Sequence, residues 1–127
     1  MFATNAQIRR ELKVSEIRFS TKNFRSVVYN LINNALKFKS PKRDPEIMIK
    51  TEELNDFILL TVKDNGIGMD DDKIESIFKM YGRLNDDTEG QGLGLFLIKK
   101  IINASGGKVE VESETGKGTT FKIFLKK

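Results

Sequence analysis

The sequence predicts an α+β fold, a two-layer sandwich in which a mixed, mostly antiparallel β-sheet carries helices on one face. Three observations predict it. Residues 24–36 place apolar side chains at helical spacing, and two pairs of short apolar-rich segments are each joined by a turn sequence, as in β-hairpins. The hairpins and helices are also segregated along the chain, which favours helices packed on one side of a single sheet.

Length and composition are those of one soluble globular domain. The chain has 127 residues, with 39% apolar and 31% charged side chains. It contains no cysteine and no histidine, which excludes disulfide scaffolds, thiolate metal sites, Ser-His-Asp triads and a phosphohistidine on this chain. A net charge of +4 is compatible with an anionic ligand, but the basic residues are scattered and a solvated surface is the better interpretation.

The N-terminal third is predicted to hold one strand and one long helix. Residues 1–15 have weak periodicity, and we expect a truncated leader or linker stub there, with the domain proper over residues 16–127. Residues 16–20 alternate polar and apolar, which predicts a short strand. The apolar positions at 24, 27, 28, 31, 32, 35 and 36 predict a helix that Thr21 caps and that ends near Phe38.

The rest of the chain is predicted to form two hairpins separated by helices. Short turns around residues 55–56 and 115–118 join the strands of each pair. In order, we expect strands 46–53 and 57–63, a short helix over 70–78, a polar irregular segment over 79–91, a helix from 92–93 to the glycines at 106–107, and strands 108–114 and 119–125.

One stripe of the long helix carries side chains suited to a metal–phosphate group. Asn30, Asn34 and Lys37 are spaced by four and three residues, so they lie on one face. An asparagine oxygen can bind Mg²⁺ and a lysine can bind phosphate. The alternative is an ordinary solvated helix face, although asparagine is a poor helix former and residues 30–34 hold three.

Two glycine-rich segments are candidates for close approach to a ligand. Residues 64–68 (Asp-Asn-Gly-Ile-Gly) place a carboxylate at a strand end before two glycines, although a simple glycine turn explains them equally well. Residues 90–95 (Gly-Gln-Gly-Leu-Gly-Leu) lead into a helix, whose exposed N–H groups suit an anion. Here we favour function over a hinge, because glycine inside a first turn lowers helix stability. The glycines at 116 and 118 need no function beyond a hairpin turn.

Together, and in this order, these segments resemble the catalytic ATP-binding domain of the sensor histidine kinases. That domain belongs to the superfamily that also holds gyrase, the heat-shock chaperone ATPases and the mismatch-repair ATPases, with the Bergerat-type ATP-binding fold. The resemblance covers roughly residues 16–127. Residues 29–38 are similar to the N box, 64–68 to the first glycine box, 77–81 to the F box, 90–95 to the second glycine box, and 116–121 to the Gly-x-Gly-Thr-x-Phe ending.

The resemblance implies ATP and Mg²⁺ as cofactors and a role for each matched residue. Asn34 would bind Mg²⁺, Asn30 would lie near the phosphates and Lys37 would contact them; these three are the implied catalytic residues. Asp64 would accept a hydrogen bond from the adenine amine. The remaining implied nucleotide-binding residues are Phe38 beside the nucleotide, Gly66, Ile67, Gly68, Met69 and Thr120 at the adenine end, Arg83 in a lid over 79–91, and Gly92, Leu93, Gly94 and Leu95 near the phosphates.

The residue at position 30 distinguishes two branches of this superfamily. Its ATP-hydrolysing members have a glutamate there as the base that activates water, and asparagine cannot accept a proton at neutral pH. Asn30 therefore indicates phosphoryl transfer to a protein side chain. The alternatives are a serine/threonine kinase of the anti-sigma-factor type, which normally keeps the glutamate, and a nucleotide-binding docking module without transfer activity.

The implied partners follow from the missing histidine. The acceptor would lie on a separate dimerisation domain of the parent protein, and a response-regulator receiver domain would follow in the pathway. No nucleic acid and no membrane insertion by this domain are implied. We expect a cytoplasmic domain, because ATP is cytoplasmic, and the sequence leaves open whether the parent protein is anchored in a membrane.

Overall fold

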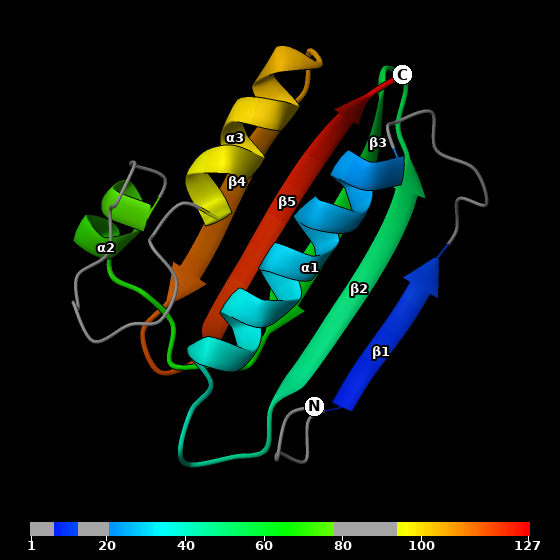
Figure 1. Ribbon diagram of the computed structural model, residues 1–127. Helices are drawn as coiled ribbons and strands as arrows, with labels where there is room; N and C mark the ends of the chain where they lie inside the picture. The colour runs from blue at the N-terminus through cyan, green and yellow to red at the C-terminus, as the bar shows by residue number, and fades with distance from the viewer. Residues whose placement is uncertain (1–6, 13–20, 78–93) are drawn as a thin grey trace.

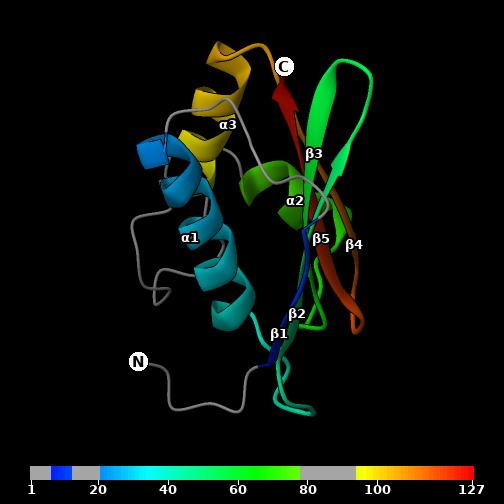
Figure 2. The same cartoon turned by 90° about the vertical axis from the view of Figure 1, so that its right-hand side faces the viewer.

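The helices and the sheet form two layers. The computed structural model describes residues 7–12, 21–77 and 94–127. Helices α1 (Thr21–Lys37) and α3 (Gly94–Ala104) lie side by side on one face of the sheet (Figure 1). A view turned by 90° shows the same two helices on one side of the strands (Figure 2). The expected α+β sandwich is confirmed.

Within the part of the chain that the structure describes, five strands form the sheet in the order β1-β2-β3-β5-β4. The antiparallel pairs are β2 with β3, β3 with β5, and β4 with β5, whereas β1 runs parallel to β2. The mixed, mostly antiparallel sheet is therefore as predicted. The strands are β1 (Gln7–Leu12), β2 (Glu46–Glu53), β3 (Phe57–Asp64), β4 (Lys108–Glu114) and β5 (Gly118–Lys126).

Strand β1 was missed by the sequence analysis, which assigned residues 1–15 to a leader or linker stub. Its only apolar residues are Ile8 and Leu12, four positions apart, so it shows no alternation. The physical reason is its place at the sheet edge, where charged residues replace the apolar face of an inner strand. Ile8 is 48% exposed. The strand expected at residues 16–20 lies outside the described residues.

The core lies between the two helices and the sheet. The apolar stripe predicted for α1 provides its helical side, since Val27, Leu31 and Ala35 are buried there. Alternation along the strands provides the other side, with every second residue of β2, β3 and β5 buried. The other buried apolar side chains are Leu36, Ile47, Ile49, Ile58, Leu60, Val62, Met69, Leu95, Ile98, Ile102, Phe121, Ile123 and Leu125.

Local capping interactions fix the ends of the shorter helices. Helix α2 (Asp71–Ile77) begins after Asp70, whose Oδ1 accepts a hydrogen bond from the Lys73 N–H at 2.9 Å. Helix α3 ends at Ala104 and is followed by Gly106, which has a φ of 86°, and the Gly107 N–H donates back to the Ile102 carbonyl. None of the described helices is long and apolar enough to cross a membrane.

Candidate functional site

Asp64, the last residue of β3, lies at the centre of the site. Its Oδ1 accepts hydrogen bonds from the backbone N–H of Gly66, at 2.8 Å, and of Thr119, at 3.2 Å. These donors come from the following loop and from β5, so one carboxylate oxygen joins two distant segments. Among the described residues nothing donates to Oδ2, which leaves that oxygen as an acceptor for a ligand.

Burial raises the pKa of the Asp64 carboxyl above its ordinary value. Desolvation is the larger cause, and the two backbone N–H donors act in the opposite direction by stabilising the charged form. A ligand that donates a hydrogen bond to the carboxylate would also favour the charged form. The site therefore holds a partly desolvated acceptor that a donor on a ligand would complete.

Glycines allow the backbone segments around Asp64 to touch. A Cβ on Gly66 would lie 2.4 Å from the carbonyl oxygen of Phe38, at the end of α1. Gly68 has a φ of 74°, and a Cβ there would lie 2.0 Å from the carbonyl oxygen of Glu114. The predicted close approach is real, but the partner at both positions is the protein's own backbone.

A hydroxyl pair links this loop to the β4–β5 hairpin. The Ser113 hydroxyl accepts the Met69 N–H at 2.8 Å and donates to the Gly118 carbonyl at 2.9 Å. Its proton is thereby used, so in the 2.8 Å contact between Ser113 and Thr119 the donor is Thr119. The backbone N–H of the same Thr119 donates to Asp64, so the hydroxyl pair supports one of the two donors to that carboxylate. Ser113 had no motif to identify it in the sequence.

The structure corrects the threonine expected at this end of the site. The sequence analysis named Thr120, but Thr120 alternates along β5 with the buried Thr119 and Phe121, so its side chain lies on the opposite face of the sheet. Thr119 is the residue that is buried next to Asp64. The reason is the pleat: a shift of one residue along a strand reverses the face.

The stripe on α1 extends from the site along the helix. Asn30 and Asn34 are half-buried and Lys37 is exposed at the last turn. The Asn30 Nδ2 donates to the Ser26 carbonyl at 2.8 Å, which turns its amide back along the helix. Among the described residues none hydrogen-bonds to the Asn34 side chain. Asn30, Asn34 and Lys37 all lie within α1, so their spacing of four and three residues places them along one side of the helix.

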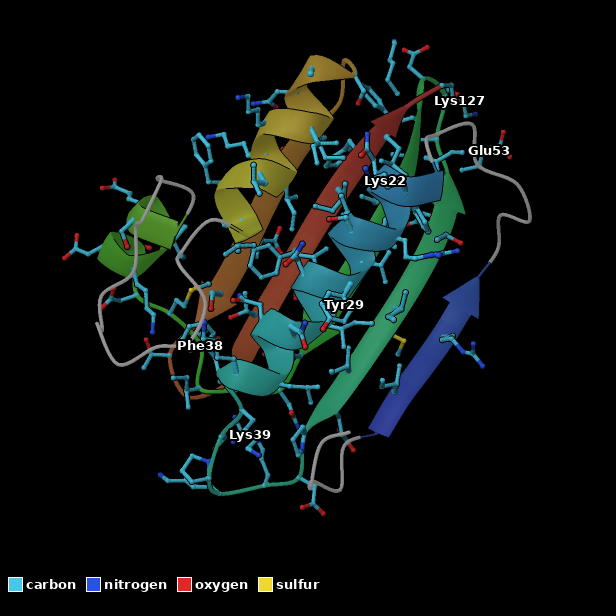
Figure 3. The ribbon with its side chains drawn as sticks, viewed as in Figure 1. Lys22, Tyr29, Phe38, Lys39, Glu53 and Lys127 are labelled. Carbon is cyan, nitrogen blue, oxygen red and sulfur yellow. The ribbon has the colours of Figure 1, made fainter. Side chains whose placement is uncertain are left out.

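Phe38 follows α1 and joins this stripe to the glycine loop, because its carbonyl accepts the Ile67 N–H at 2.9 Å (Figure 3). Two ammonium groups lie near its ring: Lys73 of α2 at 4.5 Å from the centroid, and Lys37 at 6.0 Å. The sequence analysis missed Lys73, since nothing in the spacing of α2 shows that it folds onto Phe38. Two cationic side chains therefore lie at the Phe38 ring.

The other predicted residues fall into three groups. Ile67 is 37% exposed beside the site, whereas Met69 and Leu95 are buried in the core. Gly94 is the first residue of α3, so its N–H lies at the helix N-terminus. Arg83, Gly92 and Leu93, together with the expected lid over 79–91, lie outside the described residues.

Comparison with known proteins places this geometry in a family. The histidine kinase-, DNA gyrase B- and HSP90-like ATPase family matches residues 20–127. The chain belongs to this family. The methanogenesis regulatory histidine kinase FilI of Methanothrix harundinacea is 34% identical over 103 residues, covering 81% of this chain and 12% of FilI. The sensor histidine kinase YvrG of Bacillus subtilis is 38% identical over 107 residues, covering 82% of this chain and 18% of YvrG.

A solved structure of a histidine kinase catalytic domain has the same fold as this chain. The catalytic domain of histidine kinase ThkA superposes with a TM-score of 0.81 at 25% identity, covering 97% of this chain and 80% of that one. The resemblance to the ATP-binding domain of sensor histidine kinases is therefore confirmed. The chain spans less than a fifth of the length of FilI and of YvrG.

Proposed function

We propose that this domain binds Mg–ATP and donates the γ-phosphoryl group to a histidine on a separate dimerisation domain. The observation that carries the proposal is that the two ends of the site differ in chemistry. One end is the half-buried carboxylate of Asp64, and the other is the α1 stripe of amides and lysine. A base with an exocyclic amine fits the first end and a polyphosphate fits the second.

The base end would recognise adenine through Asp64. Its Oδ1 is occupied by two backbone donors, so the carboxylate is held in place and Oδ2 would accept the amine. A guanine presents a carbonyl at the same position and would face the carboxylate with an acceptor. We propose that the Thr119 hydroxyl, which donates to Ser113, would be a second acceptor for the base.

The phosphate end has the donor set that Mg²⁺ accepts in nucleotide complexes. Magnesium keeps several waters and takes one or two protein oxygens together with substrate phosphates. The side-chain amide oxygen of Asn34 would be that protein ligand, and Mg²⁺ would neutralise charge on the phosphate oxygens. Lys37, and with it Lys73, would add positive charge at the same corner. Positioning and charge stabilisation are what phosphoryl transfer requires.

Asn30 supports transfer over hydrolysis. Its amide nitrogen donates to the Ser26 carbonyl, and its oxygen cannot take a proton from water at neutral pH. Helix α1 contains no acidic residue that would replace it. Because the chain has no histidine, the phosphoryl acceptor has to come from another domain.

Calorimetry and a transfer assay test the proposal. The chain should bind Mg–ADP, and Asn34→Ala should weaken Mg–ADP while changing metal-free ADP little. Asn33→Ala is the matched control, since it removes an amide about 100° away around the same helix. With a histidine-bearing helical domain from its own parent and radiolabelled ATP, the chain should label that domain, and Asn34→Ala should abolish the labelling. A chain that binds neither ADP nor ATP would overturn the proposal.

The same assay separates two other functions. Labelling of a serine or threonine would favour a kinase of the anti-sigma-factor type. Nucleotide binding without transfer to any acceptor would favour a docking module. We favour histidine as the acceptor because Asn30 stands where the hydrolysing members and the anti-sigma-factor type carry glutamate.

The cellular setting follows from the same proposal. We propose a cytoplasmic domain, a dimerisation domain of the parent as its first partner, and a response-regulator receiver domain as the second acceptor in the pathway. The relatives support this setting, since they are long proteins of which this chain matches a small part.

A further inference from the structure

Arg43 lies outside every motif, yet it contacts three backbone carbonyls at the base end of the site. It is an exposed residue in the loop that joins α1 to β2. Its Nε donates to the Asn65 carbonyl at 2.6 Å, and one Nη donates to the Gly66 carbonyl and the Gly116 carbonyl, each at 2.9 Å. These distances are those of well-formed charge-assisted hydrogen bonds.

The three carbonyls belong to two segments that together hold Asp64. Residues 65 and 66 form the loop whose Gly66 N–H donates to the Asp64 carboxylate. Gly116 lies in the β4–β5 turn, from which β5 begins and supplies the Thr119 N–H to the same oxygen. The Gly116 N–H also donates to the Ile67 carbonyl at 2.7 Å. Arg43 therefore bridges the two segments that hold Oδ1.

A second set of bonds attaches the Arg43 loop to the same place. The Asn65 side chain accepts the Glu46 N–H at 2.9 Å and donates to the Asp44 carbonyl at 3.1 Å. The backbone on both sides of Pro45 is thus tied to the glycine loop. The guanidinium is fixed at its base, so less freedom is lost in holding its three bonds.

We propose that Arg43 is a positioning residue for base recognition. It acts on the nucleotide through the loop at 65–66 and the turn at 116, which orient the Asp64 carboxylate and its free oxygen. This inference rests on the proposed function for its ligand, and the geometry that carries it is independent of nucleotide. It assigns to Arg43 a role in selecting adenine over other bases.

A lysine at this position would not replace the arginine. A lysine has one nitrogen at the end of a flexible chain, whereas the fork of Arg43 meets three carbonyls on two segments. Arg43→Lys therefore keeps the charge and removes the bridge. A purely electrostatic role, such as attraction of phosphate, would survive that change.

Nucleotide selectivity provides the first test. Calorimetry measures ADP and GDP affinity for the wild type, Arg43→Ala, Arg43→Lys and Lys42→Ala, which removes a neighbouring positive charge from the same loop. We expect both Arg43 variants to lose about tenfold in the ratio of ADP to GDP affinity, equivalent to about 1.4 kcal/mol. Lys42→Ala should keep the wild-type ratio. An unchanged ratio in both Arg43 variants would overturn the inference, and a ratio restored by lysine would replace it with an electrostatic role.

Hydrogen exchange without nucleotide provides the second test, which does not depend on the proposed function. The amides of Gly66, Ile67 and Gly116 should exchange about tenfold faster in Arg43→Ala than in the wild type, and the Leu60 amide in β3 should be unchanged. Equal exchange at all sites would refute the bridging role. If the wild type binds no nucleotide but these amides still lose protection, the proposed function fails and the bridge stands.

Discussion

Replacing Asp64 by asparagine separates base recognition from folding. In Asp64→Asn the Oδ1 atom stays and continues to accept the N–H groups of Gly66 and Thr119. The second oxygen becomes an NH₂ group, which presents a donor to the donor of an adenine amine. The perturbation is thus confined to the oxygen to which no described residue donates a hydrogen bond.

The expected loss follows from the one bond that is removed. A hydrogen bond to a charged acceptor contributes about 1.5–3 kcal/mol, so ADP affinity should fall by about 10- to 150-fold. Calorimetry with ADP at neutral pH measures the loss. Equal affinity of wild type and variant would refute the assignment of Asp64 to the base.

The raised pKa of Asp64 sets the direction in which the free energy of unfolding changes with pH. The native carboxyl binds its proton more tightly than the unfolded chain does, so its ionisation costs native stability. This cost is absent when the pH is below the pKa that the carboxyl has in the unfolded chain. It develops as the pH rises from there through the raised native pKa, and it persists at neutral pH. Asparagine carries no such cost, so Asp64→Asn should have the higher melting temperature at pH 7, by a margin that shrinks toward pH 3. A lower melting temperature at pH 7 would contradict the desolvation argument.

Four further substitutions test the packing of the site and of the core. Gly68→Ala should lower the melting temperature more than Gly116→Ala. Both glycines have a positive φ, which costs about 1–2 kcal/mol for alanine, but only at Gly68 would the added Cβ clash with backbone atoms. Equal losses in the two variants would refute the close approach at Gly68. Ile102→Ala should lower the free energy of unfolding by about 2–5 kcal/mol in a urea titration, because that side chain is fully buried. Ser113→Ala leaves the Met69 N–H without its acceptor, which should cost about 1–3 kcal/mol in the same titration, and a neutral effect would show that the hydroxyl pair is dispensable.

Periodicity predicted the elements that bury a regular face. Helix α1 and the strands of both hairpins follow from apolar spacing, because the core selects every third or fourth residue of a helix and every second residue of a strand. Strand β1 could not be found that way, since its six residues include only two apolar side chains, Ile8 and Leu12, which lie four positions apart.

The errors at the site have different physical causes. The choice between Thr119 and Thr120 could have been made from the sequence, because Phe121, Ile123 and Leu125 mark the covered face of β5 and Thr119 continues their alternation. Arg43 and Lys73 could not have been chosen. Their partners lie far away in sequence, or in another element, and no local spacing encodes such contacts.

The position of β5 in the sheet has a consequence for the order in which the molecule can become active. It is the last of the five strands to be synthesised, yet it lies between β3 and β4. Until it emerges, β4 has no neighbour to pair with and Asp64 lacks its bond from Thr119. A nascent chain that ends before β5 therefore exposes two unpaired strand edges, which favour misassembly. Nucleotide binding by nascent chains would therefore depend on the synthesis of β5. In a translation experiment it would distinguish chains that contain β5 from shorter ones.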